Sequence, residues 1–146
     1  MSKLSVHISS GKRDGFGDWL DKCVTGGSPI GIIYSLNENI SGDLTQHSPT
    51  TKWVYRYQTD EFNRTPTGFL EGDPVKNATE WLTQTKDSHH RTLIQNWALN
   101  KADWHDPLNE PVPDNEVKAR WFNTWMLTAL NIADQNGFKL AYGSFT

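Results

Sequence analysis

The chain has 146 residues, of which 36% are hydrophobic and 12% aromatic, so it can form one folded domain over residues 1–146. Its formal net charge of −3, without a cluster of Lys or Arg, argues against nucleic-acid binding, and its single cysteine excludes a disulfide within the chain. The N-terminus lacks the apolar core of a signal peptide and no stretch could span a membrane, so we expect a soluble protein of unspecified cellular location with no membrane partner.

The first third of the chain is expected to form two strands around one helix. Apolar and polar residues alternate over 3–9, which predicts a short strand. Apolar residues at helical spacing then predict a helix that starts near Phe16 and ends at Gly26. The nearly continuous apolar run over 29–36 is typical of a parallel strand that is covered on both faces.

The middle of the chain contains a connection, an aromatic strand and a long helix. Residues 39–51 show no clear period and are expected to form a polar connection. The aromatic-rich segment 52–58 predicts a third strand, followed by a loop over 59–72. Asp73-Pro74 is a typical helix start, and apolar spacing continues this helix to Trp97, with a bend or an interruption at 87–90.

The last third predicts two strands around a second long helix. Residues 102–108 form a short candidate strand that is ended by its own polar residues. A capped helix is expected to begin near Asp114 and to stop at Gly137. Residues 138–143 then predict a fifth strand.

Strands that alternate with helices predict a parallel sheet with right-handed crossovers. This pattern fits either an open doubly wound sheet or part of an eight-stranded barrel. The glycines match neither the dinucleotide-binding fingerprint nor the phosphate-binding P-loop, which removes the commonest reason to prefer the open sheet. We therefore predict an α/β fold, a parallel (β/α) barrel that is truncated after about five strands.

The segment from Trp104 to Pro111 carries the clearest functional signal. Glu110 follows the fourth predicted strand, at the end where a parallel barrel places its catalytic groups. Asn109-Glu110-Pro111 at this position resembles the acid/base motif of clan A glycoside hydrolases, the group that contains the family 5 endoglucanases and mannanases. The resemblance implies that Glu110 is the general acid/base and that Asn109 holds the sugar 2-hydroxyl. The same residues also fit a solvated strand-to-helix loop, because Asn and Pro favour turns.

Other residues near the motif are candidates for substrate binding. Trp104 and Trp53 offer apolar faces on which a sugar ring could stack, as do the tyrosines of the third strand. His105 and Asp106 flank the motif, and strand alternation allows only one of them to face the site. We expect a carbohydrate as the partner, and neither a metal nor a cofactor.

Retaining hydrolysis requires a second carboxylate, which the resembling family supplies from the end of strand seven, so the resemblance covers only the first part of such a barrel. We therefore expect a glycoside-hydrolase-like domain that is incomplete in this chain, with self-association through open sheet edges. The alternative is a non-catalytic carbohydrate-binding or interaction domain on a degenerate barrel.

The remaining polar candidates have simpler interpretations. His89-His90 is expected to be a solvated patch rather than a metal site, because adjacent residues do not share a helix face. His7 lies within the first predicted strand and is expected to be a core histidine. Asp60-Glu61 follows the third strand and is expected to be a charged loop, although it could also reach the motif.

Overall fold

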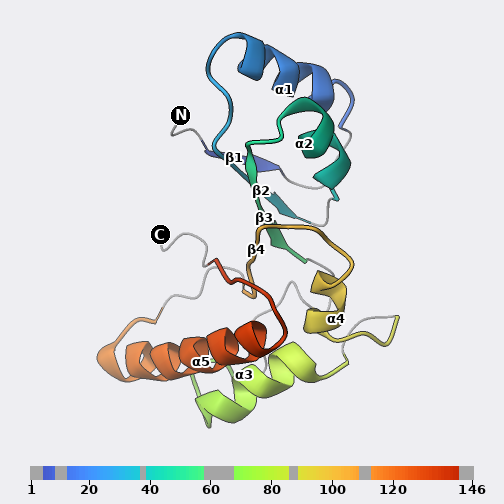
Figure 1. Cartoon of the computed structure of the whole chain (residues 1–146). Helices are drawn as coiled ribbons and strands as arrows, with labels where there is room; N and C mark the ends of the chain where they lie inside the picture. Colours follow the sequence, from blue (N-terminus) through green and yellow to red (C-terminus); the bar gives the residue numbers. More distant parts are fainter. Residues whose placement is uncertain are drawn as a thin grey trace.

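The computed structural model describes residues 5–8, 13–36, 39–57, 68–85, 89–108 and 113–141. Within these residues, strands and helices alternate around a parallel sheet (Figure 1). The strands are β1 (Ser5–Ile8), β2 (Ile32–Leu36), β3 (Lys52–Arg56) and β4 (Trp104–His105). The helices are α1 (Phe16–Thr25), α2 (Ser41–His47), α3 (Pro74–Thr83), α4 (Leu93–Trp97) and α5 (Glu116–Gln135). The predicted α/β class is confirmed.

The sheet follows the order of the chain. Each described strand is parallel to its neighbours, in the order β1-β2-β3-β4. Leu140 extends this order by a parallel bridge to His105, whose N–H donates to the Lys139 carbonyl oxygen at 2.8 Å. The predicted fifth strand is thus represented by one bridge, and residues 142–146 lie outside the described part. A doubly wound sheet reverses its strand order at a switch point, and the described strands contain no such reversal.

Local sequence explains where three of the helices begin and end. Gly26 is the C-cap of α1, as predicted. The Asp73 side chain accepts backbone N–H groups of the first turn of α3, and Pro74 occupies the start of that helix. Asn115, the residue after the predicted Asp114, caps α5 through its side-chain oxygen. Asp73 and Asn115 satisfy N–H groups that have no partner within their helices, and the Gly26 N–H donates to a carbonyl of the last turn of α1, so these residues set the boundaries locally.

Residues 39–51 contain α2 and are not the polar connection that the sequence predicted. This helix has only seven residues, of which Leu44 alone is buried, so it is too short to show a period. Ile40 precedes it and is fully buried in the core. Helix α2 is therefore stabilised mainly by packing against the sheet and α1, which local propensity does not report.

The sequence predicted a long helix over 73–97 with a bend or an interruption at 87–90, and the structure shows the interruption. Helix α3 ends at Thr83, and α4 begins after Thr92 with a reciprocal capping box between Thr92 and Gln95. His90 has a φ of 56°, a left-handed conformation that does not occur within a right-handed helix. The capping box supplies the second helix start, so the chain can turn between α3 and α4.

The two faces of the sheet have different surroundings. Side chains alternate along a strand, so paired residues on neighbouring strands share a face. One face, called here the helix face, carries Val6, Ile8, Ile33, Ser35, Trp53, Tyr55 and His105. The other, called here the open face, carries His7, Tyr34, Val54, Arg56 and Trp104. Strand residues that pack in the apolar clusters with helices belong to the helix face, and those of the open face do not.

Two apolar clusters hold the described elements together. The first joins α1 and α2 to the helix face and includes Leu20, Ile33, Ile40, Leu44, Trp53 and Tyr55. The second joins α3, α4 and α5 and includes Trp81, Leu82, Trp97, Trp121, Phe122 and Trp125. Tyr57 packs against both clusters, so the core is continuous beneath the helix face. Helices α3 and α5 lie side by side beyond β4 in Figure 1.

His7 differs from its expected position. It was predicted to be a core histidine, but its side chain is exposed on the open face of β1. It packs edge-on against Tyr34, with ring centroids 5.0 Å apart. The cause is that β1 lies at the edge of the described sheet, where none of the described helices packs on the open face. Among the described helices, none is long and apolar enough to cross a membrane.

Candidate functional site at the carboxyl end of β4

The predicted acid/base residue Glu110 and its neighbour Asn109 lie outside the described residues, as do Asp60 and Glu61. The segment 106–108, which leads from β4 directly into this motif, is described in full. The candidate site is therefore built from this segment and from the open face beside it.

Segment 106–108 is irregular but is held from three other elements. The Asp106 N–H donates to the Tyr55 carbonyl of β3 at 2.9 Å. The Tyr34 hydroxyl of β2 donates to Asp106 Oδ2, and Asp106 Oδ1 accepts the Leu108 N–H at 3.1 Å.

Helix α3 holds the other end of this segment. The Trp81 indole N–H donates to the Pro107 carbonyl at 2.8 Å. Leu108 is 4% exposed and packs in the second cluster. The backbone that precedes the motif is therefore fixed by β2, β3 and α3, which is the support that a precisely positioned functional group needs.

Asp106 is an unusual carboxyl group because it is almost fully buried, with 1% of its surface exposed. Burial raises its pKa from 3.8 to about 6, and the hydrogen bonds from Tyr34 and Leu108 and the charge of Arg56 only partly oppose this. A buried carboxyl with a shifted pKa at a strand end is typical of functional sites.

Tyr34 is the centre of a group of polar side chains on the open face. Its hydroxyl is bound by Asp106, and its ring packs against His7 on one strand and Arg56 on another. The Arg56 guanidinium carbon lies 5.5 Å from the ring centroid, within the range of a cation–π contact. Paired register brings these side chains from β1, β2, β3 and the end of β4 to one place.

His105 lies on the helix face, so it does not belong to this group and its predicted role in substrate binding is not supported. It is 3% exposed and packs among the rings of Tyr55, Trp97 and Phe138. Neither ring nitrogen has a hydrogen-bond partner within the described part of the chain. Burial lowers its pKa from 6.5 to about 4. The nearby backbone of Trp97 and Lys139 raises the pKa in part, although neither forms a hydrogen bond of good geometry with the ring. Asp106, and not its neighbour His105, lies on the side of the open face, which agrees with the prediction that only one of the two would do so.

The two predicted stacking tryptophans lie on opposite faces. Trp104 is partly buried on the open face, in register with Val54, which suits the predicted stacking role. Trp53 is 1% exposed on the helix face, and its indole N–H donates to Ser35 Oγ at 2.5 Å. Trp53 is thus a core residue, and the expectation that it stacks on a sugar is not supported. The error arose because an aromatic strand does not reveal which face is covered.

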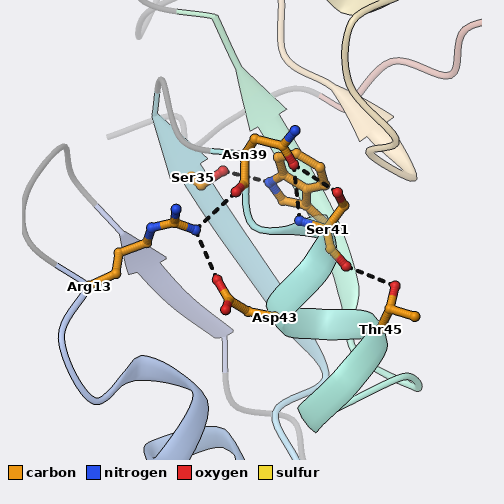
Figure 2. Close-up of polar contacts among 7 residues, drawn as sticks. Arg13, Ser35, Asn39, Ser41, Asp43 and Thr45 are labelled. Atoms are coloured by element: carbon orange, nitrogen blue, oxygen red, sulfur yellow. Dashed lines mark hydrogen bonds and ion pairs between the residues drawn. The ribbon is translucent and has the colours of Figure 1, made fainter.

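A second set of contacts joins the two neighbouring βα connections on the carboxyl side of the sheet (Figure 2). Arg13, which follows β1, donates from Nη1 to the Asn39 carbonyl and to Asp43 Oδ2, both at 2.9 Å. Asn39, which follows β2, accepts from the Ser41 hydroxyl at 2.7 Å and from its N–H at 3.2 Å. These contacts fix the start of α2 relative to Arg13.

A pocket of about 280 Å³ lies at the other end of the sheet, between α2, the start of β3 and the segment before β4. Its lining includes Trp53, Lys101 and the ion pair of Lys52 with Asp103, whose Nζ–Oδ1 distance is 2.9 Å. Catalytic groups in parallel sheets collect at the carboxyl ends of strands, so we do not assign this pocket to the site. No group of three or more His, Cys, Asp or Glu side chains that could hold a metal ion is found within the described ranges.

The sequence drew attention to the motif but missed Tyr34 and Arg56, which lie near Asp106. Both residues come from strands far from the motif along the chain, and no local pattern links them to Asp106. Only the pairing register could have indicated the group. The chain matches no protein-family model, no curated protein and no solved structure.

Proposed function

We propose that this chain is the N-terminal portion of a glycoside-hydrolase-like (β/α) barrel that acts on a β-linked polysaccharide. In this proposal Glu110 is the general acid/base and Asn109 holds the sugar 2-hydroxyl. Trp104 on the open face offers the stacking surface.

The main support is the position of Asn109-Glu110-Pro111 directly after the anchored segment 106–108, beyond the fourth of the sequentially ordered parallel strands. Sequential order with crossovers of one hand keeps all helices on one face, which is the arrangement of a barrel. The open face would then correspond to the barrel interior, and its polar group to the mouth where sites form.

The proposed chemistry is retaining hydrolysis, which needs a nucleophile about 5–5.5 Å from the acid/base carboxyl. Asp106 does not suit that role, because it is 1% exposed and its oxygens bind Tyr34 and Leu108. The nucleophile would belong to a later strand of the barrel. The 146-residue polypeptide alone should therefore hydrolyse aryl β-glycosides negligibly, while it still binds the sugar chain.

Affinity electrophoresis in soluble β-linked polysaccharides, run with an assay of aryl β-glycoside hydrolysis, tests this proposal. We expect retardation of the chain, weaker retardation of Asn109→Ala, and no turnover. Asn131→Ala, an exposed change on α5, is the matched control and should behave as the unchanged chain. Absence of retardation with every β-linked polysaccharide would contradict the function, and turnover lost in Glu110→Gln would contradict the assigned mechanism.

A second candidate is a non-catalytic carbohydrate-binding domain. It is favoured by one observation: the carboxyl group of Asp106, which lies beside the described open face, is buried rather than presented to a ligand. Expression of the complete product of the gene separates the two candidates. Hydrolysis that Glu110→Gln abolishes supports the enzyme, and polysaccharide binding without hydrolysis supports the second candidate.

A further inference from the structure

Arg56 is a polar side chain of the open face whose donors bind no residue that the structure describes. It ends β3 and is partly buried, yet its guanidinium has no hydrogen bond or ion pair to the residues that the structure describes. The Arg56 guanidinium carbon lies over the Tyr34 ring, 5.5 Å from its centroid. A guanidinium carries five N–H donors, and those of Arg56 are open to water or to a ligand on the open face.

Two other arginines among the described residues do have carboxylate partners. Arg13 pairs with Asp43 at 2.9 Å, and Arg120 pairs with Glu116 at 2.6 Å. The Asp106 carboxyl near Arg56 is instead bonded to Tyr34 and Leu108 and is not in an ion pair with the guanidinium.

The surroundings of Arg56 are also fixed in place. The Tyr34 hydroxyl is bonded to Asp106, and the Tyr34 ring packs perpendicular to the ring of His7. Arg56 therefore rests on a platform that links β1, β2 and the end of β4. Its rigid fork of donors matches the two oxygens of a carboxylate, and Arg binds such groups in a bidentate manner.

We propose that Arg56, supported by Tyr34, binds the carboxylate of a sugar acid, so that the substrate is a β-linked glycan containing uronic acid residues. This proposal rests on the proposed function, because it names the substrate class of that same site. Trp104 on the same face would stack on the sugar ring while Arg56 selects the carboxylate.

Tryptophan fluorescence titrations with two matched probes test the proposal. The probes are a tetrasaccharide of β-linked glucuronic acid and the neutral tetrasaccharide of β-linked glucose, with inorganic phosphate as a third ligand. We expect the unchanged chain to bind the acidic tetrasaccharide at least tenfold more tightly than the neutral one. A difference of this size is expected when one ligand makes a charge-assisted bidentate contact that the other cannot make. Phosphate should bind more weakly than the acidic tetrasaccharide.

The variants are Arg56→Gln, Arg56→Lys and the exposed control Arg120→Gln. Arg56→Gln should lose the preference for the acidic probe and keep its affinity for the neutral one, and Arg120→Gln should keep both. Arg56→Lys retains the charge without the fork, so it should keep part of the preference and gives a second reading if Arg56→Gln fails to fold.

Three results would overturn the inference. They are equal binding of the two tetrasaccharides by the unchanged chain, a preference that persists in Arg56→Gln, or phosphate binding as tight as that of the acidic probe. Equal binding leaves the proposed function intact, whereas binding of neither tetrasaccharide contradicts both proposals.

Discussion

His105 and Asp106 are neighbours in the chain but lie on opposite faces of the sheet, and burial shifts their pKa values in opposite directions. The pKa of Asp106 is raised from 3.8 to about 6, so its stabilising effect is fully present below pH 3.8 and is lost as the pH rises to about 6. The pKa of His105 is lowered from 6.5 to about 4. Its contribution to the free energy of unfolding is therefore fully present above pH 6.5 and is lost as the pH falls to about 4. The two effects nearly cancel in the unchanged chain.

Replacement of Asp106 by Asn should leave the pH dependence of the unfolding free energy that is due to His105. Asn keeps an acceptor for the Leu108 N–H but cannot ionise. Relative to the unchanged chain, we expect Asp106→Asn to gain about 3 kcal/mol of unfolding free energy between pH 3.8 and pH 6. Urea denaturation at several pH values measures this difference. Asp18→Asn, at an exposed carboxylate of α1, is the control, and a gain of the same size there would contradict the assignment to Asp106.

His105→Phe should have the opposite pH dependence. Phe should fit among the rings of Tyr55, Trp97 and Phe138, and it removes two buried nitrogens that bind no described residue. We expect the variant to be more stable by about 1 kcal/mol at pH 7. Its advantage should grow by about 3 kcal/mol more near pH 4, where the unfolded imidazole is protonated and the buried one resists protonation. The same urea series measures it, with exposed His89→Phe as control. An advantage that does not depend on pH would show that His105 is not buried as a neutral group.

At the scale of elements, the packing of α3 against α5 carries the second cluster. Trp125 of α5 is fully buried, and its indole N–H donates to Asn77 Oδ1 of α3 at 3.0 Å. Phe69 packs on its ring edge-on, with centroids 5.8 Å apart. This pair of helices fixes Trp81, which in turn holds the Pro107 carbonyl before the motif. Core packing and the candidate site are therefore linked through α3.

Trp125→Ala should destabilise the chain by about 3–5 kcal/mol, because it opens a large cavity between α3 and α5. Trp125→Phe keeps most of the apolar volume and should cost about 1–2 kcal/mol through the lost hydrogen bond and smaller ring. Urea denaturation at pH 7 and constant protein concentration compares them with Asn131→Ala, which should stay within about 0.5 kcal/mol. Equal stability of Trp125→Ala and the unchanged chain would show that the helices do not pack as described.

At the scale of the whole molecule, the open face and the sheet edges distinguish a part of a barrel from a self-sufficient sheet. Parallel sheets are normally covered on both faces, and the described helices cover one. Ile32 on the open side is 43% exposed, and Leu127 of α5 is 54% exposed. These surfaces are those that further strands and helices would cover in a barrel.

The 146-residue polypeptide by itself should therefore self-associate through these surfaces while it keeps its packed core. Size-exclusion chromatography with light scattering should give species heavier than 16.6 kDa. A monodisperse monomer at all protein concentrations would contradict the barrel portion and indicate a self-sufficient open sheet.

The sequence by itself determined the α/β class, the order of the main elements, the caps of α1 and α3, and the position of the motif after the fourth strand. These features depend on hydrophobic period and on turn and cap residues, which act within a few positions along the chain. Tertiary structure alone decided that α2 forms, that Trp53 and His105 are core residues, and that Tyr34 and Arg56 lie near Asp106. Helix α2 depends on the burial of Ile40 and Leu44, and the side on which a strand residue lies depends on pairing register and on which face the helices cover. Those are contacts between segments far apart in the chain, and no local pattern encodes them.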